Sequence, residues 1–166
     1  GVNPHDKLND LESARIIISH VTEGLKLAEQ YNLPREIKEF ITTHHGTGLA
    51  KYFYIHYKNE HPDEEVNEDQ FRYPGPNPFT REQAILMMSD TVEAASRSLQ
   101  EYTEESISAL IDRLIDRQVS EGHFHNCPIT FRDIAQAKAV MLERLKSIYH
   151  TRISYPELNT PTPTQR

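Results

Sequence analysis

Long apolar runs are absent from this 166-residue chain. A helix that crosses a bilayer needs about 20 consecutive apolar residues. No segment approaches that length, and the N-terminal stretch lacks the pattern of a signal peptide. We therefore expect any membrane anchor of the natural protein to lie outside this chain. The sequence also has one cysteine, Cys127, which excludes an internal disulfide and fits a reducing compartment.

An excess of positive charge is missing as well. The chain has 18 Lys and Arg against 25 Asp and Glu, so its formal net charge is −7. A general nucleic-acid binder needs a basic face that neutralises phosphates, and this balance argues against a nucleic acid polymer as partner. It leaves room for a small anionic ligand held by a few local cations and metals.

Convincing strands and internal repeats are also lacking, and the sequence predicts an all-α fold in one domain. Apolar residues recur at steps of three and four, which marks helical faces. The predicted helices run over 11–32, 34–46, 48–59 and 80–99, and two more follow Thr103 and Thr130, with Thr80, Thr103 and Thr130 as N-caps. We interpret 61–78 as a long excursion loop. We predict that residues 1–150 form the domain and that 151–166 form an extended Pro/Thr-rich tail.

A histidine pair at the predicted end of a helix is the first candidate for chemistry. In "FITTHHGTGLA", His44 and His45 stand just before Gly46. Neutral imidazole is the commonest metal ligand in proteins, and the exposed carbonyls of a helix end suit a nearby dication. The alternative is a helix cap together with one histidine that is hydrogen-bonded in the core.

Two further residues favour the metal interpretation. His20 lies near the apolar face of the first predicted helix, and Gly24, one turn on, indicates close approach of a neighbouring helix or a site. Asp90 lies on the predicted stripe Met87, Asp90/Thr91, Ala94, where a carboxylate needs a partner or a metal; its other candidate partners are Arg97 or a nearby hydroxyl. Together these imidazoles and this carboxylate suit Fe, Mn, Zn or Ni better than Mg or Ca.

Two long segments carry a resemblance. "SHVTEGLKLAEQYNLPREIKEFITTHHGT" and "FRYPGPNPFTREQAILMMSDTVEAASRSL" resemble the HD-domain phosphohydrolases. The branch they resemble is membrane-anchored: seven-transmembrane receptors with an intracellular HD domain, similar to cyclic di-AMP phosphodiesterases. The resemblance covers residues 3 to 150. It implies an HD-like helical bundle and a cytoplasmic domain of a membrane protein.

The resemblance also implies a set of metal ligands. The family order is His, His-Asp, His, His-His and a final Asp, and its last four members match His20, His44, His45 and Asp90. The pair His5-Asp6 spells the motif, but we reject it because His20 follows too closely and because an "NPHD" stretch in this family lies downstream of the true pair. Asp6 is instead expected to cap a helix. We therefore expect this chain to lack the N-terminal helices of the bundle and three ligands.

The chemistry implied by the resemblance is metal-assisted hydrolysis of a phosphodiester, with two divalent transition metals, iron or manganese first and zinc or nickel as alternatives. In substrate binding, Lys51 and Arg72 would contact phosphate and Tyr73 would stack on an adenine. The alternatives are solvated surface cations at Lys51 and Arg72 and a hydrophobic loop anchor at Tyr73.

Other functions stay open at this point. An HD nucleotidase or alarmone hydrolase would use the same metals on a mononucleotide. A third interpretation is a non-catalytic module that senses a ligand or mediates dimerisation. If helices are missing, the apolar surface they leave would suit a homodimer. The trio His123, His125 and Cys127 in "HFHNC" has zinc-like character but no second clustered pair, so we interpret it as a loop without a site.

Overall fold

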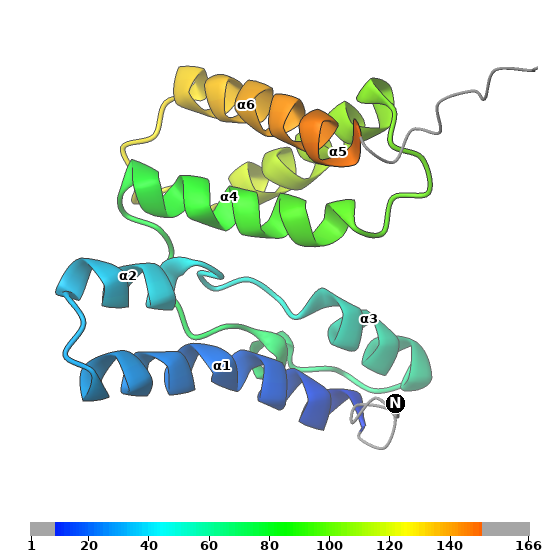
Figure 1. Cartoon of the computed structure of the whole chain (residues 1–166). Coiled ribbons are helices and arrows are strands. Elements are labelled where there is room, and N and C mark those ends of the chain that lie inside the picture. Colours follow the sequence, from blue (N-terminus) through cyan, green and yellow to red (C-terminus); the bar gives the residue numbers. More distant parts are fainter. Residues whose placement is uncertain (1–8, 151–166) are drawn as a thin grey trace, which may run out of the picture.

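The computed structural model describes residues 9–150, and over this range the chain is helical (Figure 1). Its elements are α1 (Asp10–Gln30), α2 (Arg35–Thr43), α3 (Lys51–Glu60), the 3₁₀ helix η2 (Glu68–Phe71), α4 (Arg81–Ser96), α5 (Glu104–Ser120) and α6 (Phe131–His150). The described residues contain no strand beyond an isolated bridge between Leu49 and Arg72. The all-α prediction is therefore confirmed.

Side-chain caps define where several helices begin. Thr80, Thr103 and Thr130 each accept a hydrogen bond from the backbone N–H three residues on, at 3.2, 3.1 and 3.0 Å. Such caps satisfy amides that the first turn of a helix leaves unpaired. The three predicted threonine caps are confirmed. Asn9 caps α1 in the same way.

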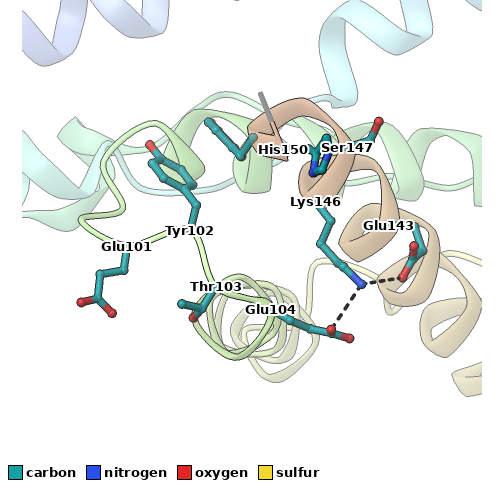
Figure 2. Close-up of a pocket in the computed structure, with 9 residues that line it drawn as sticks. Glu101, Tyr102, Thr103, Glu104, Glu143, Lys146, Ser147 and His150 are labelled. Carbon is teal, nitrogen blue, oxygen red and sulfur yellow. Dashed lines mark hydrogen bonds and ion pairs between the residues drawn. The ribbon is translucent and has the colours of Figure 1, made fainter. Parts of the chain in front are cut away.

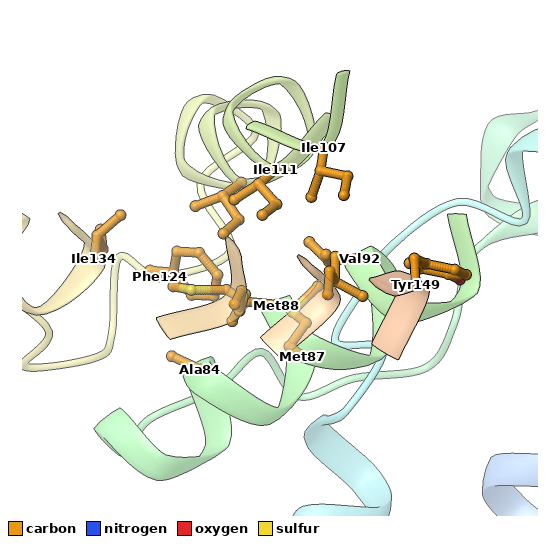
Figure 3. Packing of buried hydrophobic residues seen from close by; sticks show 12 residues of the cluster. Ala84, Met87, Met88, Val92, Ile107, Ile111, Phe124, Ile134 and Tyr149 are labelled. Carbon is orange, nitrogen blue, oxygen red and sulfur yellow. The ribbon is translucent and has the colours of Figure 1, made fainter. Parts of the chain in front are cut away.

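The helices form two groups, visible in Figure 1 as α4 to α6 above and α1 to α3 below, with α2 packed against α4. The upper group surrounds the main core (Figure 3). Its buried side chains come from all three helices and from the loop before α6, and they include Met88, Val92, Ile107, Ile111, Ile115, Phe124 and Leu145. At its end the Ser96 and Tyr149 hydroxyls lie 3.0 Å apart in a buried hydrogen bond.

The lower group has a smaller core, and the segment 61–78 belongs to it. Phe71 is fully buried with Ala14 and Ala50, and its ring lies 5.6 Å from those of Tyr54 and Tyr57. The expectation of a long loop without regular helix is confirmed, since the segment contains only the short 3₁₀ helix η2. The sequence did not predict that this loop packs on α1 and α3, where burial of an aromatic ring offsets the cost of ordering the loop.

We expect Phe71→Ala to lower the free energy of unfolding by about 3–5 kcal/mol, since it removes a fully buried ring and leaves a cavity. Urea denaturation measures the change. Phe131→Ala is the matched control, because Phe131 is 83% exposed and its loss is expected to change stability by less than about 0.5 kcal/mol. Similar effects of the two substitutions would contradict the anchoring role of Phe71.

Gly24 explains how closely the first two helices approach. A Cβ at this position would lie 3.4 Å from Ile41 Cγ2, so the glycine serves the contact between α1 and α2. The two helices and the loop that connects them expose several large apolar side chains, namely Ile16, Leu27, Tyr31, Leu33 and Ile37.

Across the described residues, no helix combines the length and hydrophobicity that crossing a bilayer requires. The predictions for His5-Asp6 and for the tail 151–166 fall outside the described residues.

Candidate metal centre

Three imidazoles from two parts of the chain meet at one point. His20 lies on α1, whereas His44 and His45 follow α2, which ends at Thr43, slightly earlier than predicted. One ring nitrogen of each histidine lies within 4.8 Å of the others. The tertiary structure thus brings together the three predicted nitrogen ligands.

Hydrogen bonds to the backbone fix the orientation of two of these rings. His20 Nδ1 donates to the Ile17 carbonyl, and His44 Nδ1 donates to the Ile41 carbonyl at 2.6 Å. A carbonyl only accepts, so the proton of each neutral ring sits on Nδ1 and the lone pair sits on Nε2. The two Nε2 atoms face each other at 3.2 Å. A cation between them turns this unfavourable contact into two ligand bonds, and backbone partners of this kind commonly orient metal-bound histidines.

His45 is held neutral by its surroundings. Burial, and then the neighbouring His44 and His20, lower its pKa from 6.5 to about 3. Tyr73 stacks on its ring with centroids 4.3 Å apart and an interplanar angle of 21°. Burial and the nearby Asp90 charge raise the pKa of Tyr73 to about 12. Neutral imidazole is the form that binds a metal.

Asp90 lies at the edge of this cluster. Its Oδ2 is 3.8 Å from His45 Nδ1, and its side chain is 45% exposed. The predicted stripe on α4 is right for Met87, which is buried in the main core with Ala84, Met88 and Val92, and wrong for Asp90 and Ala94, which are exposed. The Asp90 carboxylate therefore lies outside the hydrophobic core and close to the imidazole of His45.

A cavity of about 140 Å³ adjoins the cluster, and two of the three predicted substrate-binding residues line it. Its lining consists of His45, Gly48, Leu49, Lys51, Tyr73, Met87, Thr91, Leu114, Arg117, Gln118, Glu121 and His123. Lys51 and Tyr73 are thus placed beside the cluster, and Lys51 Nζ donates to Glu121 at 2.9 Å. Arg72 is outside this lining. Its guanidinium donates to Glu68 at 2.8 Å and to the Thr47 carbonyl at 3.1 Å.

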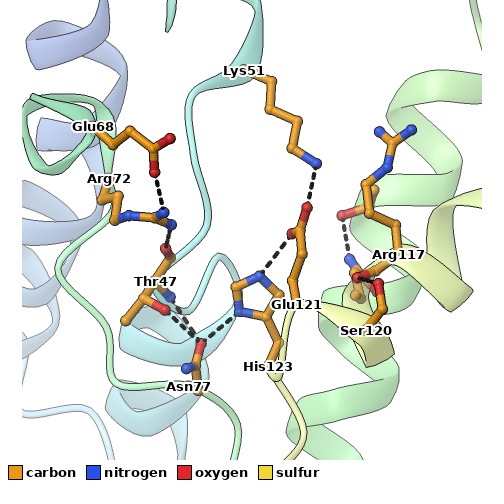
Figure 4. A network of polar contacts seen from close by, with 11 residues as sticks. Thr47, Lys51, Glu68, Arg72, Asn77, Arg117, Ser120, Glu121 and His123 are labelled. Atoms are coloured by element: carbon orange, nitrogen blue, oxygen red, sulfur yellow. Dashed lines mark hydrogen bonds and ion pairs between the residues drawn. The ribbon is translucent and has the colours of Figure 1, made fainter. Parts of the chain in front are cut away.

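Two loops, 44–50 and 72–78, are joined by hydrogen bonds, and Figure 4 shows the contacts of Thr47 with Asn77 and with Arg72. Ala50 N–H donates to the Phe71 carbonyl at 2.7 Å, and Tyr73 N–H donates to the Gly48 carbonyl at 2.9 Å. Asn77 Oδ1 accepts from Thr47 N–H at 2.9 Å. These bonds hold the segment "RYPGPN" against "HHGTG" and so position Tyr73 on His45.

His123 lines the cavity beside the histidine cluster, a position that the sequence did not indicate. It is 4% exposed. Its Nδ1 donates to Asn77 Oδ1 at 2.9 Å, and its Nε2 lies 3.3 Å from Glu121. Burial lowers its pKa, against the opposing effect of Glu121. Asn77 is 46 residues away in the sequence, so no local pattern could reveal this contact.

The rest of the "HFHNC" trio has other contacts. Cys127 donates to the Thr80 carbonyl at 3.2 Å, and His125 is exposed. Among the described residues the trio forms no metal-binding group.

A separate cluster of Asp10, His56 and Glu60 contains an ion pair of 2.6 Å between His56 and Asp10. The hydrogen bond to Asp10 raises the pKa of His56, so the two side chains are partners in an ion pair.

A larger depression of about 840 Å³ lies between α6 and the start of α5 (Figure 2). Lys146 bridges Glu104 and Glu143 there, at 3.2 and 3.5 Å. The depression shares no residue with the histidine cluster.

Comparison with solved structures identifies the class of protein. The crystal structure of the Listeria monocytogenes phosphodiesterase PgpH HD domain in complex with cyclic di-AMP superposes with a TM-score of 0.85 and 40% identity, over 90% of this chain and 69% of that one. A second crystal structure of the same HD domain gives a TM-score of 0.83 and 39% identity. No protein-family model matches the chain. The chain belongs to the HD-domain family, in the branch that contains PgpH.

Curated relatives point to the same branch. The cyclic-di-AMP phosphodiesterases PgpH of Bacillus subtilis and Listeria monocytogenes are each 41% identical, over 93% and 95% of this chain. The uncharacterized protein slr0104 of Synechocystis is 37% identical over 95% of the chain. The chain spans 22% of the length of the two PgpH proteins and 20% of the third.

Proposed function

We propose that this chain is the metal-binding part of a phosphodiesterase domain that hydrolyses cyclic di-AMP. The observation that supports the proposal most strongly is that the unprotonated Nε2 atoms of His20 and His44 face each other at 3.2 Å. The 40% identity to an HD domain crystallised with cyclic di-AMP supports this substrate over a mononucleotide. It also favours a catalytic parent protein over a purely ligand-sensing module.

The donor set fits a divalent transition metal. His20, His44 and His45 would supply the nitrogens, and Asp90 would supply a carboxylate from the edge of the cluster. Imidazole-rich sites with one carboxylate suit iron or manganese, with zinc and nickel as alternatives. When bound, such metals lower the pKa of a coordinated water and neutralise charge on a phosphoryl group.

The protein's own residues prepare this centre. The Ile17 and Ile41 carbonyls hold His20 and His44 in the Nδ1–H tautomer. Tyr73 covers one face of His45 and limits the access of water to it. Because that face is occupied, Tyr73 would stack on an adenine with its other face. Arg72, whose guanidinium already contacts Glu68 and Thr47, would bind phosphate only after releasing one of them.

The cellular setting is also part of the proposal. By its resemblance to membrane-anchored receptors, we infer that the chain is a cytoplasmic domain of a membrane protein. A homodimer stays a prediction from the sequence, and the exposed apolar side chains of α1 and α2 would suit it.

Binding of cyclic di-AMP tests the proposal directly. We expect isothermal titration with Mn²⁺ to show binding that chelation abolishes, and to show at least about tenfold weaker binding of AMP, because AMP makes fewer contacts. Asp6→Ala is the control for the rejected His-Asp pair and is expected to bind like the unaltered chain. Metal-independent binding, or a loss of binding in Asp6→Ala, would contradict the ligand assignment.

A further inference from the structure

The cavity beside the histidine cluster contains a buried amide with an unused acceptor. Gln118 lines this cavity and is 6% exposed. Its Nε2 donates to Thr91 Oγ1 at 3.0 Å, whereas its Oε1 is buried without a hydrogen-bond partner among the described residues. Most buried polar groups in proteins are paired. An unpaired acceptor at a cavity wall therefore indicates a ligand that brings a donor.

The size of the cavity limits what this ligand can be. Its volume is about 140 Å³, whereas pockets that enclose drug-sized ligands measure roughly 300–1,000 Å³. A whole cyclic dinucleotide is too large for it. One planar part of such a ligand is of a suitable size.

The chemistry of the walls favours a neutral group over an anion. Leu49, Met87 and Leu114 offer apolar contact surface. Two cations, Lys51 and Arg117, also line the cavity. Lys51 is paired with Glu121 at 2.9 Å, so a phosphate entering beside Lys51 would meet a carboxylate. A phosphate diester also has no donor for Gln118 Oε1. The cavity suits a flat, largely apolar ring that carries a hydrogen-bond donor.

We propose that this cavity receives one adenine of a cyclic dinucleotide and that Gln118 Oε1 accepts a hydrogen bond from its exocyclic amino group. The proposal rests on the proposed function and adds the means by which the base is chosen. Oε1 is shielded from solvent, so the amide would have to turn toward the cavity as the base enters and would release its hydrogen bond to Thr91. Guanine presents a carbonyl at the equivalent ring position, so two acceptors would face each other. A site that hydrogen-bonds an N–H rejects an analogue that lacks it.

Cyclic di-IMP is the probe that tests this role, because it replaces each exocyclic amine with a carbonyl. We expect the unaltered 166-residue chain with Mn²⁺ to bind cyclic di-IMP about tenfold more weakly than cyclic di-AMP in isothermal titration, a difference of ~1.4 kcal/mol. In Gln118→Met, which keeps the length of the side chain, the two ligands are expected to bind within about twofold of each other.

Thr91→Val is the matched control. It breaks the same Gln118–Thr91 hydrogen bond but keeps the Gln118 carbonyl, so the preference for cyclic di-AMP is expected to persist. Loss of the preference in both variants would indicate a merely structural role for Gln118 and overturn the inference. Equal binding of the two ligands by the unaltered chain would overturn it even if Gln118→Met does not fold, and would leave the proposed function standing. No binding of cyclic di-AMP at all would overturn both.

Discussion

Replacing His44 with alanine is expected to weaken Mn²⁺ binding by at least about 100-fold. The substitution removes one of two imidazole nitrogens that face each other at 3.2 Å. Loss of a residue that only supports a ligand already costs roughly 10–100-fold in metal affinity, so loss of the ligand itself is expected to cost more. Equilibrium dialysis or isothermal titration measures the affinity.

His125→Ala is the control for this experiment. It removes an imidazole of the same size from an exposed position outside the metal-binding groups among the described residues, and Mn²⁺ affinity is expected to stay within about twofold. Circular dichroism would show whether both variants keep their helices. Unchanged affinity in a folded His44→Ala variant would refute the proposed metal centre.

Turnover of cyclic di-AMP by this chain is expected to be on the order of 100-fold slower than turnover by the Listeria monocytogenes PgpH HD domain, with Mn²⁺ present in both assays. By the family ligand order we predict that this chain carries four of seven ligands, and the aspartate that we predict it lacks is the one expected to contact both metals. A phosphodiesterase centre that relies on two metals loses most of its activity when one site is incomplete. Initial rates at saturating substrate measure the difference.

A chimaera separates ligand count from other sequence differences. It joins this chain to the part of the Listeria domain that lies outside the aligned 69%, where we expect the missing His-Asp pair. Activity is expected to rise toward that of the Listeria domain, and mutation of the added His-Asp pair is expected to remove the gain. Equal, robust turnover by the unextended chain would refute the ligand count and the interpretation of His5-Asp6.

The helices were predictable because their signals are local. A threonine cap and the residue it bonds are three positions apart, as with Thr80 and Gln83, and apolar spacing within one helix reflects one geometry. The stripe on α4 was predicted only in part. Spacing correctly placed Met87 in the core but did not exclude Asp90, which the packing of α4 in the bundle leaves exposed.

The composition of segment 61–78 correctly predicted a loop, but it did not predict that the loop packs into the smaller core. Acidic and proline residues exclude a long regular helix, but they do not report where a single aromatic ring is buried. Phe71 packs against Tyr54 and Tyr57 of α3, and this contact depends on how α1, α3 and η2 assemble.

By itself, the sequence determined the helical class, the caps and the identity of the candidate ligands, because residue type and short spacing carry that information. Only the tertiary structure decided which atoms meet. It turned the Nε2 atoms of His20 and His44 toward each other, linked His123 to Asn77 across 46 residues, and left Gln118 Oε1 unpaired beside a cavity. These features arise where segments distant in the chain pack together. The free energy of that packing comes from many contacts together, so no single residue or local spacing predicts it.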